Sequence, residues 1–183
     1  RLRQSGIAVT QRAGSGLIQV GDATLALSDG RLASQRARED GLRNLVLLDL
    51  ALDYSSATRL AISWSADTTD SARDQAVALL QRAGLKVTGV ADLPGLVVLR
   101  TVAMLANEAA DAVLQGVGSA ADIDLAMRAG VNYPCGPLAW AANIGIAHTL
   151  RVLDNLQRSY GESRYRPSLL LRRCEAKGGT LHD

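Results

Sequence analysis

The residue types that most often transfer protons or bind metals are scarce in this sequence, which has two histidines and two cysteines among 183 residues. His148 lies early in an amphipathic segment and His182 lies near the C-terminus, and neither has a Ser or Cys nucleophile placed to form a dyad with it. Cys135 and Cys174 lack the spacing of metal ligands and are too few for a disulfide framework. We therefore expect structural histidines, no metal site and a cytoplasmic location.

The charged residues that could do chemistry have simpler explanations. Asp122 and Asp124 stand two positions apart, so they cannot face the same way on a helix. Asp122 also forms a capping box with Ser119, which indicates the start of a helix. A basic group near the C-terminus could meet a phosphate-bearing ligand, but we favour a solvated, salt-bridging surface. This group consists of Arg164, Arg166, Arg172, Arg173 and Lys177.

The glycines near the N-terminus do not form a dinucleotide-binding loop. Gly14 and Gly16 are followed by Gly21, which comes two residues late for G-x-G-x-x-G. Gly21-Asp22 instead separates the apolar segments 17–20 and 24–27, and glycine at the first turn position is typical of a type II′ hairpin. We predict a hairpin here.

The elements that must position these residues fall into two regions. In the first, continuous apolar runs predict strands and amphipathic runs predict helices. The strands are expected at 45–50, 60–64 and 85–90, and the helices at 30–39 and 71–83. The strand–helix–strand order over 60–90 is a βαβ unit, so residues 1–92 have an α/β pattern. Trp64 is expected in the core.

From Pro94 onward the pattern is helical. Helices are predicted at 96–115, at 119–130, from Pro137, at 146–160 and from Ser168. The helix at 96–115 is apolar over about two-thirds of its circumference, more than packing on a single domain needs. We therefore predict a homodimer formed through this helix, with the surfaces of Val97, Val98, Met104 and Leu105 at the contact. Trp140 is expected in the core.

The composition excludes several classes of protein. A formal net charge of +2 gives no footprint for nucleic acid. Charged or amide side chains interrupt every apolar run before the roughly 18 residues that a membrane-spanning helix needs. The chain begins at Arg1 with neither an initiator Met nor a signal peptide, so we expect a fragment of a longer chain.

Several ordered motifs resemble the 3-hydroxyacyl-CoA dehydrogenases, most clearly over residues 57–177. They are Leu93-Pro-Gly-Leu-Val-Val-Leu-Arg100, Asn107-Glu108, Asp122-Ile-Asp124, Gly130-Val-Asn-Tyr-Pro-Cys-Gly-Pro137, Pro137-Leu-Ala-Trp140 and Tyr165-Arg-Pro167. The last three look most like the phenylacetate-degradation branch, whose members oxidise 3-hydroxyadipyl-CoA or 3-hydroxybutyryl-CoA with NAD. The resemblance implies a degenerate, partial Rossmann-like α/β remnant over 1–92, followed by an all-α helical domain of the family's C-terminal type over 93–183.

In this family a His base takes the 3-hydroxyl proton as hydride leaves for NAD, and a Glu orients the base. The alignment implied by the resemblance places Leu50 at the His, Ile62 at the Glu and Leu99 at a catalytic Asn. All three residues are apolar, and residues 1–147 contain no histidine. The resemblance therefore implies a second, inactive copy of the dehydrogenase unit, which uses no NAD itself although its parent enzyme does.

Three functions remain open. The chain could pack against the N-terminal catalytic half of the same parent, replacing or adding to a dimer contact. It could also help to bind the parent's acyl-CoA substrate through a loop that closes over the acyl chain. The candidates for that loop are Asn132, Tyr133, Pro134, Gly136 and Pro137. It could alternatively be an independent acyl-CoA-binding or scaffold module.

Overall fold

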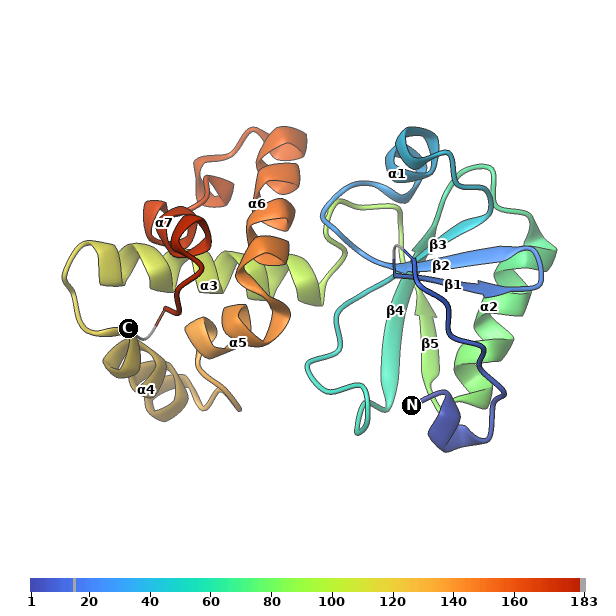
Figure 1. Ribbon diagram of the computed structural model, residues 1–183, viewed down its shortest axis with the longest axis horizontal. Helices are drawn as coiled ribbons and strands as arrows, with labels where there is room; N and C mark the ends of the chain where they lie inside the picture. The colour runs from blue at the N-terminus through green and yellow to red at the C-terminus, as the bar shows by residue number, and fades with distance from the viewer. Residues whose placement is uncertain (15, 182–183) are drawn as a thin grey trace. The chain divides into compact units, whose positions relative to one another are not determined.

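The computed structural model describes residues 1–14 and 16–181, and it divides into two compact units, Arg1–Leu99 and Arg100–Asp183 (Figure 1). His182 lies outside the described residues. Within the described part of the chain, no helix is both long and apolar enough to cross a bilayer.

The first unit contains a mixed five-stranded sheet in the order β1-β2-β3-β4-β5. The strands are β1 (Leu17–Val20), β2 (Ala23–Leu27), β3 (Leu45–Leu48), β4 (Arg59–Trp64) and β5 (Lys86–Gly89). β2 pairs with β3 and β4 with β5 in parallel, whereas the other two pairings are antiparallel. The helices α1 (Ala33–Asp40) and α2 (Asp70–Arg82) connect the parallel pairs, and a short 3-10 helix, η1 (Arg3–Ser5), precedes the sheet. The expected Rossmann-like α/β fold is confirmed.

The predicted hairpin is also confirmed, because β1 and β2 pair directly around Gly21-Asp22. Gly21 has a φ of +53°. A Cβ atom there would lie 2.2 Å from the side-chain oxygen of Gln75 on α2, so a larger residue would have to displace this side chain, and the positive φ itself favours glycine. The same oxygen accepts a hydrogen bond from the Asp22 amide at 2.9 Å, which ties the hairpin to α2.

Two apolar clusters form the core of this unit, one on each face of the sheet. The larger cluster packs α2 against β2, β3 and β4, and Trp64 lies partly buried at its edge. The smaller cluster packs α1 against the opposite face. Because all four residues of β3 are buried, this strand is covered on both faces, as its continuous apolar sequence predicts.

The second unit consists of helices α3 (Val98–Leu114), α4 (Ala120–Val131), α5 (Pro137–Ile144), α6 (Ile146–Tyr160) and α7 (Leu169–Lys177), with a 3-10 turn, η2 (Ser163–Tyr165), before α7. The all-α prediction is confirmed. The capping box of Ser119 and Asp122 begins α4, and Pro137 is the first residue of α5. Trp140 is buried, as expected.

Three of the basic residues near the C-terminus form ion pairs within this unit. Arg166 pairs with Asp111, and Arg172 pairs with Asp154 at 2.6 Å. Arg164 pairs with its neighbour Glu162. For these three side chains the salt-bridging interpretation is confirmed.

Candidate functional site

The carboxyl end of β3 meets the start of α3 through one buried carboxylate, that of Asp49. Its Oδ2 atom accepts hydrogen bonds from the backbone amides of Val97 at 3.1 Å and Val98 at 2.8 Å. Its Oδ1 atom accepts from the amides of Leu99 at 2.9 Å and Leu50 at 2.8 Å. Asp49 therefore caps α3 from a distant part of the sequence and satisfies amides that the helix itself leaves unpaired.

This geometry brings the three predicted catalytic positions together. The amides of Leu50 and Leu99 bind the same oxygen of Asp49, and Ile62 pairs across the sheet with Leu48, the residue before Asp49. The exposed fractions are 8% for Leu50, 1% for Ile62 and 0% for Leu99. Apolar side chains therefore fill the end of the sheet at the three positions where the resemblance places the family's His base, the Glu that orients the base and the catalytic Asn.

The polar groups around this filled end do not form an acid–base pair. Both oxygens of Asp49 are occupied by amides. The Tyr54 hydroxyl donates to the main-chain oxygen of Asp49 at 3.2 Å, and burial raises the pKa of Tyr54 above its ordinary value. A phenol with a raised pKa stays protonated at neutral pH, so it does not act as a base there.

The turn that leads into α3 has a strained backbone conformation, which the surrounding contacts must stabilise. Leu96 is fully buried and has a φ of +51°, a conformation that costs a non-glycine residue of the order of 1 kcal/mol. The Asp49 hydrogen bonds begin at the next residue. The sequence signal for this cap was modest: a single acid directly after a buried apolar strand.

Two more helices have caps that come from distant carboxylates. The N-cap residue of α1 is Leu32, which has no polar side chain, and Asp92 instead accepts from the amides of Ala33 at 2.6 Å and Ser34 at 3.0 Å. Asp124 does the same for α5, as described below. No local capping motif reveals these long-range caps, so sequence reasoning missed them.

The Asp92 cap bears directly on whether this unit can bind a dinucleotide. In Rossmann folds the pyrophosphate binds at the N-terminus of the helix that follows the first strand of a βαβ unit. In this unit the corresponding position at α1 is already filled by the Asp92 carboxylate. A pyrophosphate would have to displace one anion and sit close to a second, Asp29, in the preceding loop.

Asp29 is held as an anion. Burial alone would raise the pKa of Asp29, but the hydrogen bond from the Arg31 guanidinium and the charge of Arg36 outweigh it, so the pKa lies below its ordinary value. Arg31 also binds Glu39 and Asp40 on α1. The loop before α1 therefore presents carboxylates, and not the unpaired backbone amides that bind phosphate in Rossmann folds. This position does not fit the pyrophosphate of NAD.

The second unit brings the predicted substrate-lining residues together on the loop between α4 and α5. Asn132 ends α4 with a φ of +59° and is exposed, as is Pro134. The Tyr133 ring lies 5.4 Å from the Trp140 ring. The Asn132 side chain is therefore exposed on a loop whose Tyr133 ring packs against Trp140, and contact of this loop with an acyl chain remains a prediction.

Asp124 fixes the geometry of this loop. Its carboxylate accepts from the amides of Leu138 at 2.8 Å and Ala139 at 3.0 Å, which are the first free amides of α5. The N-cap residue Gly136 lies so close that a Cβ atom would be 2.1 Å from Asp124 Cγ. The Asp122–Asp124 pair thus serves two separate helix starts.

Asn107 joins two further motifs of the resemblance. This buried side chain donates to the main-chain oxygen of Arg166 at 2.9 Å and accepts from the amide of Ser168 at 2.7 Å. It therefore holds the segment around Tyr165-Arg-Pro167 against α3. The geometry of both motifs serves packing within the helical unit.

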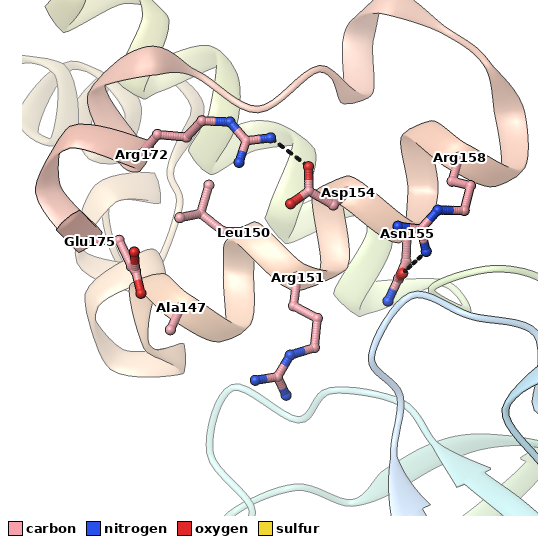
Figure 2. Close-up of a pocket in the computed structure, with 8 residues that line it drawn as sticks. All are labelled: Ala147, Leu150, Arg151, Asp154, Asn155, Arg158, Arg172 and Glu175. Atoms are coloured by element: carbon pink, nitrogen blue, oxygen red, sulfur yellow. Dashed lines mark hydrogen bonds and ion pairs between the residues drawn. The ribbon is translucent and has the colours of Figure 1, made fainter. Parts of the chain in front are cut away.

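A polar hollow of about 340 Å³ lies between α6 and α7 (Figure 2). The Arg172–Asp154 ion pair spans one side, and Arg158 donates to Asn155 at 3.0 Å. Arg151 points away from the Arg172–Asp154 pair. Among the described residues, the lining contains neither histidine nor cysteine and has little apolar wall to hold an acyl chain. His148 lies one helical turn from Arg151 and is not part of the lining.

Comparison with known proteins accounts for both units. Residues 25–94 match the model of the 3-hydroxybutyryl-CoA dehydrogenase reduced Rossmann-fold domain. Residues 95–180 match that of the 3-hydroxyacyl-CoA dehydrogenase C-terminal domain. The chain therefore belongs to the 3-hydroxyacyl-CoA dehydrogenase family.

Individual relatives are dehydrogenases of the same class. The 3-hydroxyadipyl-CoA dehydrogenase of Escherichia coli K12 is 43% identical over 162 residues, which are 88% of this chain and 33% of that protein. A probable 3-hydroxybutyryl-CoA dehydrogenase of Bacillus subtilis is 38% identical over 56% of this chain and 36% of its own length. The chain thus spans about a third of these relatives.

Solved structures give the same result. The crystal structure of a 3-hydroxybutyryl-CoA dehydrogenase from Escherichia coli K12 matches with a TM-score of 0.83 and 41% identity, covering 91% of this chain and 34% of that one. An (S)-3-hydroxybutyryl-CoA dehydrogenase from Ralstonia eutropha matches with a TM-score of 0.69 and 25% identity, covering 84% of this chain and 55% of that one.

Proposed function

We propose that this chain is the non-catalytic C-terminal part of an NAD-dependent 3-hydroxyacyl-CoA dehydrogenase, a protein that oxidises a 3-hydroxyacyl-CoA to the 3-oxoacyl-CoA. One observation carries the proposal: Leu50, Ile62 and Leu99 are buried together at the end of the sheet around the Asp49 cap. A proton acceptor is required as hydride leaves C3, and among the described residues at this end of the sheet the one carboxylate, that of Asp49, already accepts from backbone amides with both oxygens.

The Asp92 cap supports a second element of the proposal, that this chain does not itself bind NAD. Titration of the chain with NADH, followed by nicotinamide fluorescence, tests this directly. We expect no saturable signal up to 1 mM. Saturable binding by the unmodified chain would contradict the proposal, whether or not Asp92→Asn strengthens it.

The role that we propose for the chain is to pack against the catalytic half of the same protein, and to pair with a second copy when it is isolated. Large apolar side chains remain exposed between the end of α3 and the end of α4, in a set that we call the α4 surface: Leu114, Val117, Leu125 and Val131, exposed by 37%, 71%, 55% and 53%. By contrast, Met104 and Leu105 on α3 are partly buried within the chain. The α4 surface, which lies in the second unit, is therefore the stronger candidate for the contact, whereas Val97 and Val98 are exposed in the first unit.

Sedimentation velocity at micromolar concentration tests this role. We expect a two-fold dimer whose interface buries at least about 1,000 Å². Leu125→Glu should give monomers, because it places a charge in the contact, whereas the matched exposed change Leu52→Glu in the first unit should not. A monomer at all concentrations, or dimers that Leu125→Glu leaves intact, would refute the α4 contact.

A contribution to substrate binding is favoured by the exposure of Asn132 and Pro134 on a loop held by Asp124 and Trp140. If this loop closes over the acyl chain when the catalytic half is present, Asn132→Ala should raise KM for the acyl-CoA and leave kcat nearly unchanged. Equal KM values with and without the substitution would exclude this contribution.

A further inference from the structure

An apolar pocket of about 440 Å³ lies within the Arg1–Leu99 unit, on the face of the sheet that α2 covers. Its floor consists of buried leucines from β2, β3, β4, α2 and the turn after α2. These are Leu25, Leu48, Leu60, Leu79, Leu80 and Leu85. Val9 and Ile18, which are 39% and 37% exposed, lie at its mouth. The volume falls within the range of about 300–1,000 Å³ that is typical of small-molecule sites.

The N-terminal segment forms one wall of this pocket. Leu2 and Ile7 pack against the same core as α2, and Figure 1 shows this dark blue segment running beside α2. The Arg1 guanidinium donates to the main-chain oxygens of Ala83 at 2.7 Å and Gly84 at 3.1 Å, at the end of α2. The wall is thus tied to the helix by hydrogen bonds as well as by apolar packing.

The charged side chains that line the pocket are all positive. Among the described residues that line it there is no carboxylate, and the one hydroxyl, on Tyr54, already donates to the main-chain oxygen of Asp49. The charged side chains among the described lining residues are two arginines, Arg1 and Arg3. Among the described residues, no carboxylate forms an ion pair with either.

Arg3 is the more available of the two cations. Arg1 donates to three backbone oxygens, whereas Arg3 is exposed and makes a long contact of 3.5 Å with the Gln11 side chain. An aliphatic interior with a cation beside it complements an aliphatic molecule that ends in an anion. A neutral or cationic amphiphile would leave this charge unmatched.

We propose that this pocket binds a medium-length fatty acid, with the hydrocarbon chain against the leucine floor and the carboxylate beside Arg3. The pocket lies in the first unit and involves neither the α4 surface nor the loop from Asn132 to Pro137. It is therefore independent of the packing role proposed above, and either proposal can fail without the other.

A chain-length series on the intact chain tests the proposal. Octanoate, decanoate and dodecanoate are titrated by calorimetry below their critical micelle concentrations. Each methylene that enters the pocket should tighten binding about fourfold, so decanoate should bind about 15-fold more tightly than octanoate. Absence of binding by all three acids at 1 mM, or affinities that do not change with chain length, would overturn the proposal.

Matched variants locate the site. Arg3→Glu should weaken dodecanoate binding about three- to tenfold and leave dodecanol binding unchanged, whereas Arg12→Glu, an exposed arginine outside the lining, should change neither. Val9→Glu should weaken both ligands, and its control is Leu169→Glu, an exposed residue of the other unit that belongs neither to the pocket nor to the α4 surface. Circular dichroism confirms that each variant is folded. Equal effects of Arg3→Glu and Arg12→Glu would show that the carboxylate does not lie beside Arg3.

Discussion

The Asp49 cap provides the sharpest test of how the first unit is held together. Asp49→Asn keeps the size of the side chain but replaces one acceptor oxygen by an NH₂ group. Oδ1 and Oδ2 each accept from two amides, so either orientation of the new amide places a donor against two N–H groups. Each hydrogen bond to a charged group contributes about 1.5–3 kcal/mol, and the contributions are not additive, so we expect a loss of about 2–4 kcal/mol.

The measurement is urea unfolding followed by fluorescence. The chain has two tryptophans, Trp64 in the first unit and Trp140 in the second. In a Trp140→Phe background, the signal therefore reports the first unit alone. Asp22→Asn makes the same chemical change at an exposed turn and should stay within about 0.5 kcal/mol of the parent protein. An Asp49→Asn value equally close to the parent would refute the capping argument.

Three further predictions concern other parts of the structure. Leu99→Asn should destabilise the first unit by about 3–5 kcal/mol, because it removes buried hydrocarbon and buries an amide, and it should create no dehydrogenase activity. Trp64 fluorescence in urea measures the stability, and an NADH assay measures the activity. A variant as stable as the parent protein would contradict the burial argument. Gly136→Ala should lower the free energy of unfolding of the second unit by about 1–3 kcal/mol, because its Cβ meets Asp124. Its control, Gly130→Ala, places a Cβ in open space on α4 and should raise the same free energy by about 0.5–1 kcal/mol. Trp140 fluorescence measures both variants, and equal effects would exclude the clash. The pKa of Asp29 is lower in the folded than in the unfolded protein, so its contribution to stability is present above the unfolded carboxyl pKa and is lost as the pH falls below about 4. Arg31→Met should reduce this part of the acid dependence. Identical profiles of unfolding free energy against pH for the parent protein and the variant would rule out the network.

Local sequence patterns predicted the elements well because each pattern acts over a few residues. The helix expected at 146–160 has the observed bounds of α6, and the hairpin at Gly21-Asp22 forms as its turn chemistry requires. The observed ends of helices and strands differ from the predicted ends at the junction between β3 and α3. The strand expected to continue to Leu50 stops at Leu48 because Asp49 turns to cap α3. The helix expected from 96 begins at Val98 because Leu96 has a positive φ.

The candidate site was predictable only in its apolar half. The absence of a histidine before His148 can be read directly, and the burial of Leu50, Ile62 and Leu99 follows from their apolar character. The caps supplied by Asp49 and Asp92 span 48 to 59 residues of sequence, and no local motif encodes a contact of that range. The pocket under the N-terminal segment depends on how separate segments pack, which periodicity does not specify.

The central claim is that this chain lacks dehydrogenase activity of its own, and a spectrophotometric assay at 340 nm tests it most directly. The pure chain is incubated with NAD and (S)-3-hydroxybutyryl-CoA at high protein concentration. Removal of a catalytic base costs about 10²- to 10⁴-fold, and the site here also lacks a fitting place for the pyrophosphate, so we predict no NADH formation above the protein-free rate. NADH formation in proportion to the concentration of the chain would contradict the account, whether or not His148→Ala changes it.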